Sequence, residues 1–348
     1  MPLRTRRAIE DVVNGQVRAG VLGTAPIEKN LPGFRDRVGR FIGGARGEEI
    51  AFLRNTGDGA NVIALGLDWR SGDEVVLCDN EFGANALPWV ALRERGVVVR
   101  FIHAPRERMS PEVLSRYVGP RTRIVALSWV SFTDGYRHDL AALAGVAHDA
   151  GAFFCVDGIQ ALGAFPIDVK AWHIDALYAG GAKWLLALAG VSFLYLDAAL
   201  QERLTVRWRG WRDVADIWNF LDYDQPLAPG AARFEGGTPN FLGVAAMAAS
   251  MDLIEESGVP RIEAHVVALT DRLVAGLREL GAEVASERGP GISSGIVTFR
   301  LPENDPVALG RRLSSEGFIT TYRESGIRVS PHGHNTEADI DAFLARLR

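Results

Sequence analysis

Lysine is the charged residue that this sequence uses least. Of its 38 lysines and arginines only Lys29, Lys170 and Lys183 are lysine, so the other 35 are arginine. Arginine keeps its proton in proteins, whereas a desolvated lysine amine loses it and can attack a carbonyl carbon. A lysine in such an arginine-rich chain is therefore a candidate for amine chemistry.

Cysteine is equally scarce, and long apolar runs are missing. Cys78 and Cys155 both lie in apolar, strand-like runs, which favours buried thiols in a reducing compartment over a disulfide. The longest apolar run, 184–196, is too short and too rich in glycine to cross a bilayer, and the first residues lack the apolar core of a signal peptide. We expect a soluble cytoplasmic protein with no membrane partner.

An excess of positive charge is also absent. The net charge is −5 and the pI about 5.9, which disfavours a nucleic-acid partner. A stretch rich in tryptophan and arginine, 203–224, is better explained as a protein interface or site entrance than as a nucleic-acid platform. The length and the 47% hydrophobic content suit a large α/β domain with a smaller companion.

Strand-like runs alternate with helical patterns through most of the chain. This alternation predicts parallel crossovers and an open α/β sheet. The expected strands are 49–53, 73–78, 97–102, 123–128, 153–156 and 173–178, with helices over 62–67, 111–118 and 140–150. We expect a helical segment over 1–45, a large domain over 46–245 and a small α+β domain over 246–348.

The residues with the most chemical content lie between 153 and 183. Asp157 follows an apolar strand, at the end where open α/β sheets place ligand-facing groups. The strand expected over 173–178 leads through small residues to Lys183, and the apolar run 184–188 behind it is expected to lower the pKa of Lys183. From these residues alone, a solvated lysine explains the pattern as well as a functional one does.

The segments VDGIQALGAFPIDV and GGAKWLLALAGVSFLYL resemble the signature of the class V aminotransferases, which include cysteine desulfurases, kynureninase and isopenicillin-N-epimerase-like proteins. The resemblance extends in patches from about Phe52 to the C-terminus. It implies a fold-type I transferase that uses pyridoxal 5′-phosphate (PLP), with a mostly parallel central sheet flanked by helices. It also implies that Lys183 carries the cofactor as a Schiff base, that Asp157 pairs with the pyridinium nitrogen and that Gln160 contacts the ring oxygen.

A threonine- and glycine-rich segment precedes the helix expected over 62–67. A helix N-terminus can bind phosphate through its unpaired N–H groups and its dipole. Thr56, Gly57 and Asp58 match the phosphate-cup position of the family. Without the resemblance, a Thr or Asp N-cap with no ligand is the commoner explanation.

Three more positions take roles from the resemblance. Phe82 stands where a ring stacks on the cofactor, and a phenyl ring cannot shuttle protons; a core aromatic is the alternative. Thr238 lies in a turn whose threonine reaches the phosphate of the partner subunit's cofactor, which implies a homodimer with shared active sites; a turn that caps the next helix is the alternative. Arg328 matches the arginine that binds the substrate carboxylate, with an exposed strand arginine as the alternative.

Two positions depart from the family pattern. Gly180 and Ala182 stand where many members carry Ser and His, which help to hold the phosphate. Each lost charge-assisted hydrogen bond weakens binding by roughly 1.5 to 3 kcal/mol, so we expect modest cofactor affinity. His332 and His334 lack a third ligand at suitable spacing, so no metal site is expected.

Together these features predict a homodimeric PLP enzyme whose small-molecule substrate is an amino acid or keto acid. Aminotransferase is the favoured activity. A PLP-dependent lyase or epimerase of the same family is an alternative, because the first chemical steps are shared, and so is a non-catalytic binding protein with this fold. Cysteine desulfurases of this family need a cysteine on a mobile loop in the C-terminal third. Neither Cys78 nor Cys155 lies there, so persulfide transfer is disfavoured.

Overall fold

The computed structural model describes residues 1–104 and 107–348 and divides into two compact units. The larger unit comprises 1–128, 140–163 and 167–256. The smaller unit comprises 129–139, 164–166 and 257–348. The domain limits expected after residues 45 and 245 stay predictions.

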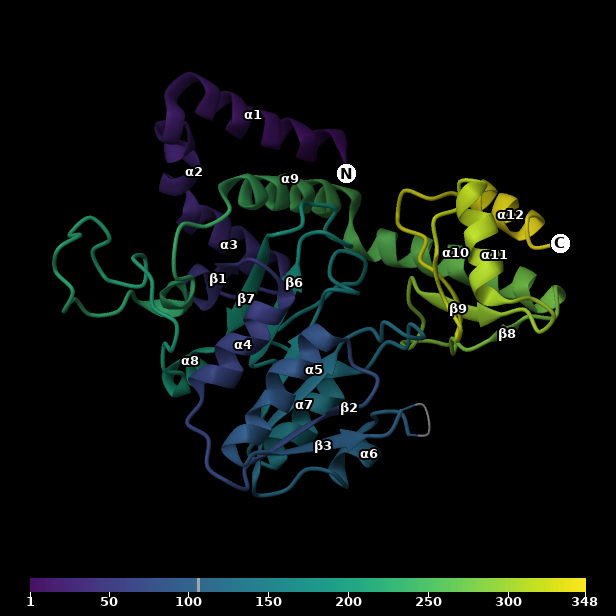
Figure 1. Cartoon of the computed structure of the whole chain (residues 1–348), viewed down its shortest axis with the longest axis horizontal. Helices are drawn as coiled ribbons and strands as arrows, with labels where there is room; N and C mark the ends of the chain where they lie inside the picture. Colours follow the sequence, from purple (N-terminus) through teal and green to yellow (C-terminus); the bar gives the residue numbers. More distant parts are fainter. Residues whose placement is uncertain (105–106) are drawn as a thin grey trace. The chain divides into compact units, whose positions relative to one another are not determined.

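A seven-stranded sheet forms the centre of the larger unit (Figure 1). Its spatial order is β1-β7-β6-β5-β4-β2-β3, and β7 alone runs against its neighbours. The predicted mostly parallel sheet is confirmed, although the strand after Lys183 was not foreseen. The strands are β1 (Ile50–Leu53), β2 (Glu74–Cys78), β3 (Val98–Ile102), β4 (Thr122–Ser128), β5 (Phe153–Asp157), β6 (Ala176–Gly180) and β7 (Ser192–Leu196).

Helices cover this sheet, which is why β1, β2 and β7 are buried along their whole length and read as continuous apolar runs. In Figure 1, α1 lies along α9, and the hydroxyls of Thr5 and Ser250 join the two helices at 2.6 Å. The helices are α1 (Leu3–Ala19), α2 (Ala25–Lys29), α3 (Leu31–Phe41), α4 (Thr56–Gly66), α5 (Gly83–Val90), α6 (Pro111–Ser115), α7 (Leu140–Asp149), α8 (Ala198–Arg203) and α9 (Phe241–Ser257).

The register of the sheet brings three side chains side by side. Asp157 at the end of β5 pairs with Ser128 at the end of β4 and with Tyr178 on β6. Residues at one register level of a parallel sheet project from the same face. A row of polar groups therefore lies across three strands at the carboxyl edge.

The smaller unit has its own antiparallel sheet, in the order β10-β11-β9-β8. Its core includes Leu273, Phe299, Leu313 and Ile327. A capping box begins α12, where Thr336 and Asp339 bond reciprocally to backbone N–H groups. The elements are α10 (Val259–Glu279), β8 (Glu283–Val284), β9 (Val297–Arg300), α11 (Pro306–Ser315), β10 (Thr321–Arg323), β11 (Gly326–Val329) and α12 (Glu337–Ala345).

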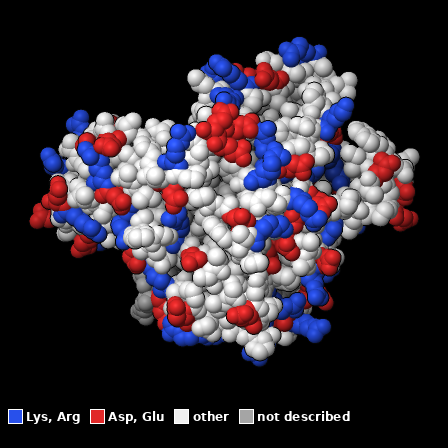
Figure 2. All heavy atoms as spheres, turned by 180° about the vertical axis from the view of Figure 1, so that it is seen from behind, with Lys and Arg blue, Asp and Glu red and all other residues white. Residues whose placement is uncertain are grey.

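Acidic and basic side chains are interspersed on the face that Figure 2 presents, with no large area of one sign. Within residues 1–104 and 107–348, no helix has the length and apolarity needed to cross a bilayer.

Gly59 is the residue that lets α4 approach the sheet. A Cβ atom there would lie 2.6 Å from Cβ of Tyr178 on β6, closer than two carbon atoms can approach without a shift. Gly145 on α7 differs, because an added Cβ would meet nothing within 4 Å.

We expect Gly59→Ala to lower the free energy of unfolding by about 1 to 3 kcal/mol, because the added methyl group overpacks the contact between α4 and β6. Urea unfolding followed by circular dichroism measures the change. The matched control Gly145→Ala should instead gain about 0.5 to 1 kcal/mol from helix propensity. Equal effects of the two substitutions would contradict the packing argument.

Candidate active site

Asp157 is a buried carboxylate that forms no ion pair within residues 1–104 and 107–348. It is 2% exposed, and its Oδ1 accepts a hydrogen bond from the Ile159 N–H at 2.9 Å. No side chain of the described residues donates to it. Burial, reinforced by the charge of Glu81 and opposed by the Ile159 N–H and by Lys183, raises the pKa of Asp157 to about 7. The site is built to receive a proton or a cationic N–H.

Lys183 follows β6 after a short run of small residues. Its Nζ lies 5.7 Å from the ring centroid of Phe82. The expected apolar enclosure of the amine is wrong, because Lys183 is exposed in this chain. Trp184 and Leu185 are 4% and 1% exposed, so they are buried in the core instead of surrounding the amine.

Phe82 stands at the N-cap position of α5. It is 48% exposed, so the alternative that it is a core aromatic is wrong. The ring and the Lys183 amine approach each other from different elements, and the exposed ring is of the type that stacks on a planar ligand.

The N-terminus of α4 differs in detail from the expected phosphate cup. The helix begins at Thr56, and Asn55, not Thr or Asp, is its N-cap: its Oδ1 accepts from the Asp58 N–H at 2.9 Å. The Asp58 carboxylate pairs with Arg54 at 2.8 Å. Both groups of Asp58 are thus engaged within the helix end, which leaves Thr56 and Gly57 as the better phosphate ligands; the predicted contact of Asp58 stays untested.

Gly180 brings Thr56 close to the end of β6. A Cβ at this position would lie 3.2 Å from Cδ1 of Ile159 and 3.4 Å from Oγ1 of Thr56. A serine here would therefore crowd both neighbours. Many family members carry a serine at the position of Gly180. In this chain the hydroxyl of Thr56 borders the space that such a side chain would occupy.

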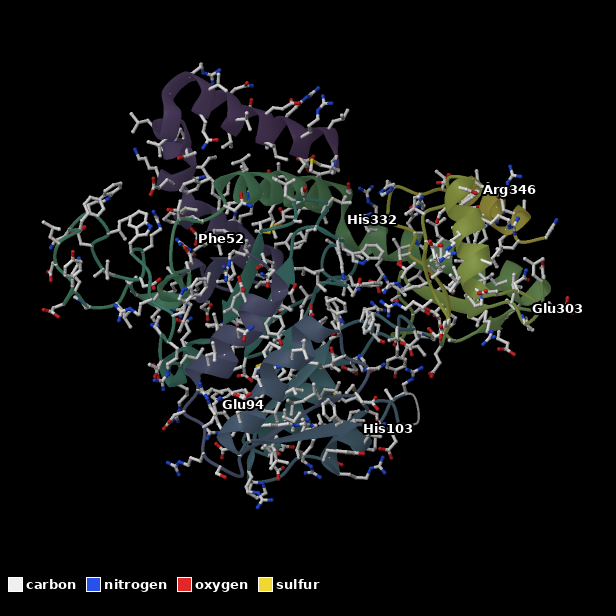
Figure 3. The ribbon with its side chains drawn as sticks, in the orientation of Figure 1. Phe52, Glu94, His103, Glu303, His332 and Arg346 are labelled. Carbon is white, nitrogen blue, oxygen red and sulfur yellow. The ribbon has the colours of Figure 1, made fainter. Side chains whose placement is uncertain are left out.

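Gln160 and Thr238 lie in different settings. Gln160 is 8% exposed and follows Asp157 in the turn after β5. Thr238 is exposed on the turn before α9. That turn is held by Glu235, whose carboxylate accepts from Arg35 at 2.8 Å and from the backbone N–H of Phe52 (labelled in Figure 3) at 2.9 Å.

Arg328 belongs to the smaller unit. Its Nη1 donates to the Phe132 carbonyl at 2.6 Å and its Nη2 to Thr321 Oγ1 at 3.2 Å, while its buried Nε has no partner in the described part of the chain. None of the described carboxylates pairs with it. Burial and the neighbouring Arg323 lower its pKa. The alternative of an ordinary exposed strand arginine does not fit this half-buried side chain.

Sequence reasoning missed Glu81, Asn85, Ser128 and Tyr178. Glu81 accepts from the Ser128 N–H at 2.7 Å and from Asn85 Nδ2 at 2.9 Å, and the Tyr178 hydroxyl donates to Asn85 Oδ1 at 2.5 Å. The signal that could have found them is a glutamate and an asparagine on either side of Phe82 after a buried strand.

The residues of the larger unit suit PLP. Asp157 offers an acceptor to a protonated ring nitrogen, Phe82 a stacking face and Lys183 a primary amine beside that face. The α4 N-terminus offers backbone N–H groups and the Thr56 hydroxyl to a phosphate. Among the described residues, no cluster of three or more His, Cys, Asp or Glu could hold a metal ion.

A family model described as "Aminotransferase class-V" matches residues 11–343. A probable cysteine desulfurase of Methanothermobacter thermautotrophicus is 31% identical over 331 residues, which cover 90% of this chain and 81% of that protein. An uncharacterized aminotransferase, YcbU, of Bacillus subtilis is 30% identical over 334 residues, covering 96% and 87%.

The fold has a close counterpart among solved structures. The apo structure of a cysteine desulfurase from Thermococcus onnurineus superposes with a TM-score of 0.90 at 26% identity, covering 99% of this chain and 90% of that one. The fold is therefore that of a fold-type I enzyme, with a mostly parallel sheet and a small antiparallel sheet.

The raised pKa of Asp157 predicts a specific pH dependence for the protein without cofactor. Between the ordinary value near 3.9 and about 7, the folded chain holds a proton that the unfolded chain has lost, so stability falls as pH rises. Asp157→Asn removes this effect. We expect the stability of the variant relative to wild type to be about 2 to 3 kcal/mol greater at pH 8 than at pH 5.

Urea unfolding at the two pH values measures this difference. Asp11→Asn, at an exposed position of α1, is the matched control and should show no such change. A pH-independent effect of Asp157→Asn would show that Asp157 is ionised in the folded protein throughout this range.

Proposed function

The chain belongs to the class V aminotransferase family, whose cofactor is PLP, and we propose that it is a lyase that eliminates a sulfur substituent from Cβ of an amino acid. The observation that carries the proposal is the placement of the Lys183 amine 5.7 Å from the Phe82 ring, in a chain that offers no accessible cysteine. Aminotransferase activity, which the sequence favoured, is the second candidate.

The residues of the site have distinct roles in this proposal. Bound PLP supplies an electron sink for the electron pair left at the substrate Cα. Lys183 holds the cofactor covalently between turnovers and then takes the proton from Cα. Asp157 accepts the hydrogen bond of the protonated ring nitrogen, and Phe82 fixes the plane of the ring.

The burial of both cysteines argues against persulfide formation on the protein. A desulfurase of that kind needs a thiolate that attacks the substrate sulfur. Cys78 is 3% and Cys155 is 0% exposed, both in strands of the central sheet, and burial raises the pKa of Cys155 well above its ordinary value. Neither thiol can reach a substrate.

The phosphate site favours elimination over transamination. A lyase has its cofactor bonded to Lys183 at the start and the end of every turnover, whereas a transaminase must retain it by contacts alone for half of each cycle. Gly180 and Ala182 provide no side-chain hydrogen bonds to the phosphate, so that retention would be weaker. Several relatives are named as cysteine desulfurases, which points to a sulfur amino acid.

We expect the purified protein with PLP to convert cysteine and water to pyruvate, hydrogen sulfide and ammonia. The C–S bond breaks, the sulfur leaves with the bonding pair, and hydrolysis of the remaining enamine releases ammonia. A coupled lactate dehydrogenase assay measures pyruvate. Lys183→Ala should reduce the rate by at least about 1000-fold because it removes the base and the covalent anchor.

Lys29→Ala, at an exposed position in α2, is the matched lysine control and should retain the wild-type rate. Full activity of Lys183→Ala would overturn the assignment. Formation of alanine or glutamate from an added keto acid, without pyruvate release from cysteine, would identify transamination, which the similarity to the aminotransferase YcbU favours.

We assign the substrate carboxylate to Arg328. Its guanidinium keeps an unpartnered, buried Nε and has no carboxylate neighbour in the described part of the chain, so it has capacity for an anion. Removal of this charge weakens binding of the substrate more than it slows the bond-breaking step.

Arg328→Gln should therefore raise KM about 10- to 100-fold with a smaller change in kcat. Steady-state kinetics over a range of cysteine concentrations measure both. Arg346→Gln, on the same unit and 62% exposed (labelled in Figure 3), is the control and should leave KM unchanged. An unchanged KM in Arg328→Gln would exclude the assignment.

We also propose a homodimer with shared active sites. Thr238 is exposed on its turn, and the loop that extends from the larger unit in Figure 1 carries exposed apolar side chains. Exposed apolar side chains that lie together are typical of a protein–protein interface. The exposed side chains of this loop are Trp208, Trp211, Trp218, Phe220, Leu221 and Tyr223.

Sedimentation of the pure protein tests the proposed homodimer, and a monomer at assay concentration would contradict it.

A further inference from the structure

Four residues form a hydrogen-bonded arch around Asp157. Ser128 and Tyr178 flank Asp157 on the neighbouring strands at the same register level. Glu81 binds the N–H and hydroxyl of Ser128, Asn85 bridges from Glu81 to the Tyr178 hydroxyl, and the arch thereby joins β4 to β6 across β5. Its only carboxylate is that of Glu81.

Through Ser128, the neighbour of Asp157 on β4, the arch brings the Glu81 carboxylate near that of Asp157. Glu81 is mostly buried, and its described donors, Ser128 and Asn85, are neutral. None of the described basic side chains forms an ion pair with it. Burial raises its pKa, and its charge in turn raises the pKa of Asp157. Two such carboxylates compete for one proton.

We infer that Glu81 is a positioning residue that, through the arch, fixes Asp157 between two strands and sets how readily Asp157 accepts a charged ring nitrogen. This inference rests on the proposed PLP site and deepens it. Glu81 immediately precedes Phe82, so the same bonds also anchor the residue that would stack on the ring.

The consequence is a pH dependence of ring binding. Asp157 must be ionised to pair with the protonated ring nitrogen, so affinity rises as pH increases through its pKa. The ionisable groups that face Asp157 are Glu81 before α5, Tyr178 on β6 and Lys183 after β6. Of these, Glu81 is the acid whose negative charge opposes ionisation of Asp157.

The test measures binding of pyridoxine 5′-phosphate by tryptophan fluorescence from pH 5.5 to 9. This probe has the ring nitrogen and the phosphate but no aldehyde, so it forms no Schiff base with Lys183. Glu81→Gln keeps the size of the side chain and removes its charge. We expect the pH midpoint of binding to fall by about one unit relative to wild type.

Two further variants separate this effect from damage to the fold. Ser128→Ala removes one donor from Glu81, which favours protonation of Glu81, so the midpoint should shift in the same direction by a smaller amount. Glu94→Gln removes an equal charge at an exposed position of the same unit (labelled in Figure 3) and should leave the midpoint unchanged.

The outcomes are distinct. A merely structural role of Glu81 would weaken binding at every pH without moving the midpoint, and that result would overturn the inference. A midpoint in Glu81→Gln equal to that of wild type would do the same. Failure of the wild-type protein to bind the probe or PLP at any pH would instead refute the proposed function.

Discussion

The site depends on one unfavourable arrangement, a carboxylate buried at the edge of a sheet that forms no ion pair with any described side chain. Asp157 is 2% exposed and has a pKa raised to about 7. Such a group lowers the stability of the empty protein and gains from any ligand that brings a charged N–H. The unfavourable free energy of burying the Asp157 carboxylate therefore favours binding of the protonated cofactor ring.

The surrounding structure holds that carboxylate in a single position. Parallel strands β4, β5 and β6 set the register, the arch of Ser128, Glu81, Asn85 and Tyr178 ties their ends, and Gly59 allows α4 to pack against β6. Because the same elements carry Phe82 and Thr56, one set of contacts orders both the stacking face and the phosphate end of the site.

The parts of the site that could be predicted were those whose evidence is local in sequence. Asp157 and Lys183 each follow a strand-like run that the sequence shows directly. The apolar run after Lys183 misled, because periodicity shows that Trp184 and Leu185 are buried but not on which side of the chain. The antiparallel β7 was missed because strand direction is set by pairing with partners far along the chain.

By itself the sequence indicated an open α/β sheet through the alternation of its elements, and the resemblance of its short motifs to a family indicated the fold type and the cofactor, because such patterns depend on neighbouring residues. The tertiary structure decided that Lys183 is exposed, that Asp58 is engaged by Arg54 and Asn55, and that Glu81 lies beside Asp157. Burial, charge pairing and pKa depend on distances through space between segments that the chain order leaves far apart.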